Sequence, residues 1–92
     1  MLSQIPFNLE KMKKEDLDEE IARIGIIAEL DAVNLYEQLA TMCESKKLKK
    51  VLLEIAREEK THVGEFQALL LEMDKEQVKE LEKGKEEVEE IG

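Results

Sequence analysis

The chain contains a single histidine, and the spacing of the residues before it could bind a metal ion. His62 follows Glu59 by three positions. On a helix, residues i and i+3 lie on neighbouring turns of one face, so both side chains can reach the same ion. Glutamate is abundant in this sequence, so a Glu three places before a lone His also arises by chance. Whether the pair binds a metal ion therefore depends on the residues that the helices bring close to it.

The composition predicts an all-α protein. A chain of 92 residues makes one small domain at most. Charged residues reach 40% and aromatic residues only 3%, with no Trp, which is typical of long helices or coiled coils. The single Pro and the four Gly leave little material for turns.

The charge and the hydropathy exclude several function classes. The formal net charge is −9, which argues against binding to nucleic acid and to anionic membrane surfaces, because both attract basic faces. No apolar run approaches the ~20 residues of a membrane span, and no signal peptide is expected. The single Cys43 cannot form an intrachain disulfide, so we expect a cytoplasmic protein in which Cys43 packs in the core.

Hydrophobic periodicity predicts an antiparallel helical hairpin over residues 15–73, preceded by an irregular lead over residues 1–14. The first helix is expected to begin near Glu15 and to end near Glu44. Ser45 is the expected N-cap of the second helix, which should end near Met73.

The apolar face of the first helix is broader than one partner helix covers, so contacts outside the hairpin are expected. Arg23 and Asp31 fall on the opposite face. The apolar face comprises Leu17, Ile21, Ile24, Gly25, Ala28, Ala32, Leu35, Tyr36, Leu39, Met42 and Cys43, and it is widened by Ile26, Ile27 and Leu30.

A short helical arm is expected over residues 74–92. Asp74 and Gln77 have the spacing of a capping box, which begins a new helical segment. This segment is expected to run to about Lys83, where Gly84 would end or kink it. The remaining tail is polar, so we expect it to be ordered only if it packs on a neighbour.

Three ionisable residues interrupt the apolar faces of the hairpin. Glu29 lies within the apolar face of the first helix, and Glu59 and His62 lie within that of the second. Counted from the turn at Ser45, all three reach about the same height, on the order of 20–25 Å. A carboxylate in an apolar seam is costly unless it takes up a proton or meets a cation. A bound metal ion would satisfy the three groups together.

The ligand types favour iron or manganese over a structural zinc site, because two carboxylates and an imidazole come without a thiolate. A polar network in which His62 is shared between Glu29 and Glu59 is the alternative. Di-iron helical bundles use a Glu from each of two helices and a Glu-x-x-His from each of two others, and one chain holds half of that set. Two hairpins related by a two-fold axis would supply the whole set, so we expect a homodimer and an inactive monomer.

Glu29, Tyr36 two turns later and the Glu59–His62 pair together resemble the encapsulated ferritins, half-ferritin proteins that work inside encapsulin shells. The resemblance covers about residues 20–80. It implies a ferritin-like four-helix bundle completed by dimerisation, and a ferroxidase that oxidises two Fe(II) per dimer with O2. It further implies an open ring of dimers, a decamer, whose iron is mineralised inside a cytoplasmic encapsulin nanocompartment.

The same resemblance implies a role for each residue of the motif. Glu29, Glu59 and His62 would be the iron ligands, each contributed by two chains. Tyr36 would lie beside the site as a hydrogen-bond partner, and the alternative for it is a core aromatic residue. The family places acidic residues on the first helix along the route of iron, and of the matching positions Ala28 and Asp31 only Asp31 keeps the acid.

Two further questions stay open at the level of sequence. The chain ends at Gly92 without the small apolar tag with which the family docks on the shell, so it is expected to be either free-standing cargo or a domain of a shell fusion. Outside the enzyme class, the hairpin would be a non-catalytic oligomerisation module. A carrier of iron, manganese or zinc in the same ligands is the third interpretation.

Overall fold

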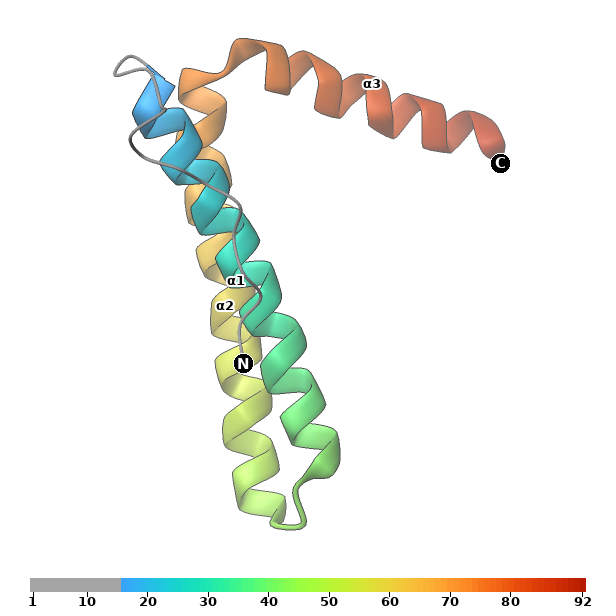
Figure 1. The fold of residues 1–92 in the computed structure, drawn as a ribbon. Coiled ribbons are helices and arrows are strands. Elements are labelled where there is room, and N and C mark those ends of the chain that lie inside the picture. The colour runs from blue at the N-terminus through green and yellow to red at the C-terminus, as the bar shows by residue number, and fades with distance from the viewer. Residues whose placement is uncertain (1–15) are drawn as a thin grey trace.

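The computed structural model describes residues 16–92, and this part of the chain forms three helices with no strand. The helices are α1 (Leu17–Met42), α2 (Lys46–Met73) and α3 (Lys75–Ile91). Figure 1 shows α1 and α2 side by side as a long antiparallel hairpin, with α3 extending away from the end opposite the turn. The all-α prediction is confirmed. The expected lead over residues 1–14 and the expected helix start at Glu15 lie outside the described residues.

The hairpin turn is built as the sequence predicts. Ser45 precedes α2 in an extended conformation, and its hydroxyl accepts a hydrogen bond from the backbone N–H of Leu48 at 3.1 Å. At the end of α1, the backbone N–H of Cys43 donates to the carbonyl of Leu39 at 3.1 Å. The thiol of Cys43 is half-buried and lies 3.5 Å from the carbonyl oxygen of Ala40. Cys43 therefore lies at the end of the seam rather than in a closed core, because the helix stops before it.

Small side chains form the seam between α1 and α2. Six apolar residues of the described range are buried, and four of these are alanines. No large side chain among residues 16–92 is fully buried. The distance between two packed helices follows the size of the side chains at their contact, so an alanine-rich seam allows a close approach. The buried residues are Ala22, Ala32, Val33, Ala40, Ala56 and Leu70.

Many large apolar side chains are exposed, as the broad face of the first helix predicts. Ile27 is 45% exposed and Leu30 is 50% exposed. The molecule measures 46 × 43 × 19 Å, so the helices form one thin layer without a second layer to cover it. Leu39 and Met42, expected on the packed face, are exposed because they lie beside the turn, where α1 ends, and they line a shallow groove there. None of the helices within residues 16–92 is long and apolar enough to span a membrane.

The helix of the arm, α3, is longer than expected. The sequence predicts a break at Gly84, but α3 runs without interruption from Lys75 to Ile91, so this expectation is wrong. A glycine inside a helix costs only about 1 kcal/mol relative to alanine, and opposite charges four residues apart, such as Lys83 and Glu87, offset part of that cost. No residue of α3 is buried, so local helix preferences rather than packing determine its length.

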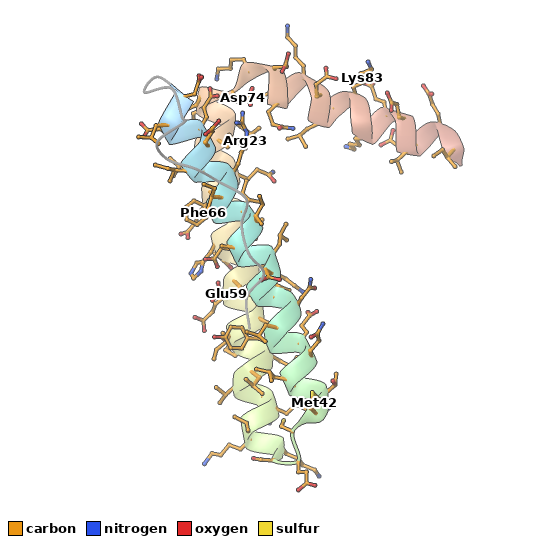
Figure 2. The ribbon with its side chains drawn as sticks, in the orientation of Figure 1. Arg23, Met42, Glu59, Phe66, Asp74 and Lys83 are labelled. Atoms are coloured by element: carbon orange, nitrogen blue, oxygen red, sulfur yellow. The ribbon has the colours of Figure 1, made fainter. Side chains whose placement is uncertain are left out.

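Asp74 joins α2 to α3 and fixes the start of the arm. Its carboxylate accepts a hydrogen bond from the backbone N–H of Gln77 at 3.0 Å, as the capping signature predicts. Arg23 of α1, expected to face away from the packed side, donates to the same carboxylate at 2.7 Å. Figure 2 shows Arg23 and Asp74 together at this corner. The Gln77 N–H, and after it the Arg23 guanidinium, favour the ionised carboxyl and lower the pKa of Asp74 from its ordinary 3.8.

Substitution of Asp74 tests this junction. Asp74→Ala removes the cap and the ion pair, so α3 should lose helicity in far-UV circular dichroism, whereas Asp74→Asn should keep the cap and lose only the ion pair. Because the folded-state pKa is lowered, the contribution of the carboxylate to stability is fully present above its ordinary pKa of 3.8 and is lost as the pH falls through the lowered value.

Thermal unfolding measured between about pH 6 and pH 2 should therefore show a steeper loss of stability in the wild type than in Asp74→Asn. Identical pH dependence in the two proteins would contradict this role of Asp74.

Candidate metal centre

Three residues that the sequence singles out meet on the hairpin. Glu29 extends from α1, and Glu59 and His62 extend from α2, where Figure 2 labels Glu59. Nδ1 of His62 lies 3.1 Å from Oε2 of Glu29 and 3.3 Å from Oε2 of Glu59. One ligand atom from each residue lies within 4.8 Å of the other two, so the group could hold a metal ion. In the described part of the chain it is the one group of three or more such side chains.

The register of the hairpin brings the three residues to one level. Glu29 lies 16 residues before Ser45, and Glu59 and His62 lie 14 and 17 residues after it. Each residue of a helix adds about 1.5 Å, so equal distances from the turn mean equal heights in an antiparallel pair. The i, i+3 spacing of Glu59 and His62 directs both to the same face of α2. The contact between Glu29 and His62 across the helices confirms the predicted coincidence of height.

The group is sheltered on one side and open on the other. The side chain of Glu29 is 22% exposed and that of Glu59 is 18% exposed, whereas that of His62 is 44% exposed. The carboxylates are therefore largely removed from water, and the imidazole forms the open side. Among the described residues, no buried side-chain nitrogen or oxygen lacks a hydrogen-bond partner, so the group leaves no buried polar atom unpaired.

The charges of the group nevertheless favour a cation. Nδ1 of His62 carries at most one hydrogen, so it cannot donate a full hydrogen bond to both carboxylates at once. Two ionised carboxylates repel each other at short range when water does not screen them. A divalent cation could bind one oxygen of Glu29, one oxygen of Glu59 and Nδ1 of His62 together. Oxygen and nitrogen donors without a thiolate suit iron or manganese, so the residues present fit such an ion.

Tyr36 and Asp31, the other two residues singled out by the sequence, are not part of the group. Tyr36 is half-buried on α1, two turns after Glu29 and on the same face. Within residues 16–92, the hydrogen bonds of the group join only its own three members, so the hydroxyl of Tyr36 makes none with them. Asp31 is half-buried and stands two positions from Glu29, which turns it about 200° around the helix and away from α2.

Two contacts near the group are missed by the sequence analysis. Nζ of Lys60 lies 3.3 Å from Oε2 of Glu37, an exposed ion pair that joins α2 to α1. The ring of Phe66 packs against Gly25 and leaves no room for a side chain there. Gly25 does carry a signal, because a glycine inside a helical pattern is costly and can mark a close approach. No sequence signal predicts the ion pair of Lys60 with Glu37, because charged residues are frequent on the exposed faces of both helices.

The chain is similar in sequence and in fold to known proteins. A family model described as EncFtn-like matches residues 5–88. Over 78 residues the chain is 62% identical to a Pyrococcus furiosus protein named "Ferritin-like-encapsulin shell fusion protein". That match covers 85% of this chain but 22% of the relative, so the chain spans less than a quarter of the relative's length. The crystal structure of the encapsulated ferritin domain from Pyrococcus furiosus superimposes with a TM-score of 0.83 at 54% identity, covering 98% of this chain and 94% of that chain.

The resemblance to the encapsulated ferritins, stated from the Glu29, Tyr36 and Glu59–His62 pattern, is thereby confirmed. The family match extends well beyond the three residues of the group and includes most of α3. The chain belongs to the EncFtn-like family.

Proposed function

We propose that the protein is a ferroxidase, which binds Fe(II) and passes its electrons to O2 to give Fe(III). The observation that supports this proposal most is the meeting of Glu29, Glu59 and His62 from two helices within 4.8 Å. Fe(II) is the substrate here, and the carboxylates and the imidazole would bind it and hold it in place. Carboxylate oxygens are hard donors, so they stabilise the more highly charged Fe(III) and favour oxidation.

We infer that a second copy of the chain completes the site. One hairpin offers two carboxylates and one imidazole, whereas di-iron centres in helical bundles take four carboxylates and two imidazoles. The exposed Leu69 lies two turns after His62 on the same face of α2, so a partner that covers it also comes close to the site. A two-fold axis would bring the same three residues of two chains together, with two irons per dimer, and the four helices would form a ferritin-like bundle. A decameric ring would be built from such dimers.

The oxidised iron would be stored outside the hairpin, because two helices in one thin layer enclose no storage cavity. The Pyrococcus furiosus relative is named as a fusion of a ferritin-like part with an encapsulin shell. We propose that this chain likewise works with an encapsulin shell protein and delivers Fe(III) to the interior of a cytoplasmic nanocompartment.

A second candidate function has its own observation. Nδ1 of His62 lies within 3.3 Å of a carboxylate oxygen on each side, so the three residues already form a closed polar network. Such a network would fix the register of α1 against α2 in a non-catalytic oligomerisation module. The two functions predict different rates of Fe(II) oxidation in the presence of the protein.

Replacement of His62 distinguishes the two functions. Protein loaded anaerobically with Fe(II) and then mixed with aerated buffer should form Fe(III) faster than buffer alone, as followed by absorbance. His62→Ala should fall to the buffer rate because the nitrogen ligand is lost, while Glu72→Ala, an exposed glutamate near the far end of the same helix, should keep the wild-type rate.

A wild-type rate in His62→Ala would place the oxidation elsewhere in the molecule. A wild type that is no faster than buffer would favour the oligomerisation module.

Replacement of Glu29 tests whether the polar group is kept for binding rather than for stability. In the presence of a chelator, Glu29→Leu should raise the free energy of unfolding by about 1 kcal/mol, because a mostly buried carboxylate gives way to an apolar side chain in an apolar seam. The control Glu72→Leu, at an exposed position of α2 away from the group, should change it by less than about 0.5 kcal/mol. Denaturant titrations give both values. A strongly destabilised Glu29→Leu would instead support the role of the network in register.

Substitution of Tyr36 separates a ligand from a neighbour of the site. Tyr36→Phe removes only the hydroxyl, so it should keep the bound metal and slow oxidation less than His62→Ala does. Native mass spectrometry counts the metal ions per chain, and the absorbance assay gives the rate. Complete loss of metal in Tyr36→Phe would make Tyr36 a ligand.

A further inference from the structure

A glycine of α1 and an aromatic ring of α2 interlock beside the candidate metal centre. A Cβ placed on Gly25 would lie 2.7 Å from Cδ1 of Phe66 and 2.8 Å from both Cε1 and Cγ. Carbon atoms in favourable contact are about 3.5–4.0 Å apart, so the ring occupies the space that any side chain at this position would need. Phe66, labelled in Figure 2, closes the seam at this level only because residue 25 has no side chain.

This interlock lies in the layer next to the three candidate ligands. Gly25 is four residues before Glu29 on α1, and Phe66 is four residues after His62 on α2. Since the helices are antiparallel, both steps lead in the same direction, and each is about one turn, or ~5.4 Å. Residues four apart lie on the same face, so the Gly25–Phe66 contact and the Glu29–His62 contact are successive contacts along one seam.

We propose that Gly25 is a positioning residue for the metal centre. Its missing side chain lets the ring of Phe66 close the seam, and this contact sets the distance between α1 and α2 where Glu29 faces His62. The inference rests on the proposed binding of metal by these residues. A metal ion tolerates deviations of only about 0.2 Å in its bonds to protein ligands, so the distance between the helices at this level governs the affinity.

The geometry shows why a methyl group at residue 25 would act on the centre. Cγ of Phe66 is attached to Cβ, close to the backbone of α2, so it cannot yield as the far end of a flexible side chain can. Room for the methyl group comes from separation of the helices or from a change of χ1 of Phe66, and aromatic residues in helices have few χ1 angles to choose from. Separation of the helices would draw Glu29, which is fixed on α1, away from Glu59 and His62.

Two glycine substitutions in the full chain test the proposal. Gly25→Ala adds the methyl group at the interlock, and Gly64→Ala adds it two residues after His62, where a Cβ meets nothing within 4 Å. Both glycines lie inside helices, so both substitutions gain the same helix propensity. The probe is Co(II), whose visible absorption reports both its affinity and its ligand geometry, and sedimentation confirms that all variants are compared in the same state of assembly.

Gly25→Ala should weaken Co(II) binding by about tenfold or more and change the visible spectrum of the bound ion, whereas Gly64→Ala should do neither. Phe66→Ala removes all three ring atoms that meet the methyl group, so adding Gly25→Ala to Phe66→Ala should have little further effect on binding. If Gly25→Ala instead loses helicity, the double variant should recover it, and failure to recover would overturn the proposal.

Wild-type affinity and spectrum in Gly25→Ala would overturn the positioning role while leaving the proposed function intact. Equal losses in Gly25→Ala and Gly64→Ala would also overturn it. A wild type that binds no Co(II) would refute the metal centre, and the positioning role would fall with it.

Discussion

Two carboxylates and one imidazole share a single level of a seam whose buried side chains are apolar and mostly small. Glu29 and Glu59 are mostly withdrawn from water, and one nitrogen of His62 stands between them with at most one proton to offer. This imbalance of charge cannot be removed by packing, because the apolar side chains of the seam provide no hydrogen-bond donors. The hydrogen bonding of His62 compensates it only in part, and in our proposal a divalent cation would compensate it more completely. The register of the whole hairpin is consistent with this one arrangement.

The sparse core explains why such a group can serve binding rather than stability. The seam buries alanines and few larger side chains, so the helices approach closely while many large apolar side chains, Ile27 and Leu30 among them, stay exposed. A hairpin of this kind gains little from its own packing and has much to gain from a second copy. In our proposal, the apolar surface and the incomplete ligand set therefore have the same solution. Association with a second copy would cover the apolar surface and complete the ligand set. Activity and assembly would therefore depend on each other.

Local signals made much of the fold predictable. Ser45 and Asp74 are capping residues whose hydrogen bonds lie within three residues, so the turn and the start of the arm follow from sequence. The meeting of Glu29 with His62 follows from counting residues from the turn. The continuation of α3 through Gly84 was not predicted, because the cost of one glycine is small beside the helix preference of its flanks. The contacts of Arg23 with Asp74 and of Gly25 with Phe66 depend on the direction of the arm and on the fit of two surfaces, which periodicity does not encode. The roles of Tyr36 and Asp31 stay predictions, because they depend on iron and on a partner chain.

The central claim is that each chain contributes half of the ligands of a shared metal site. The most direct measurement is anomalous diffraction at the iron absorption edge from crystals soaked anaerobically in Fe(II). The account predicts a pair of iron peaks on a two-fold axis between two hairpins, each at bonding distance from Glu29, Glu59 and His62 side chains drawn from both chains. Iron bound wholly within one hairpin, or far from these residues, would contradict it.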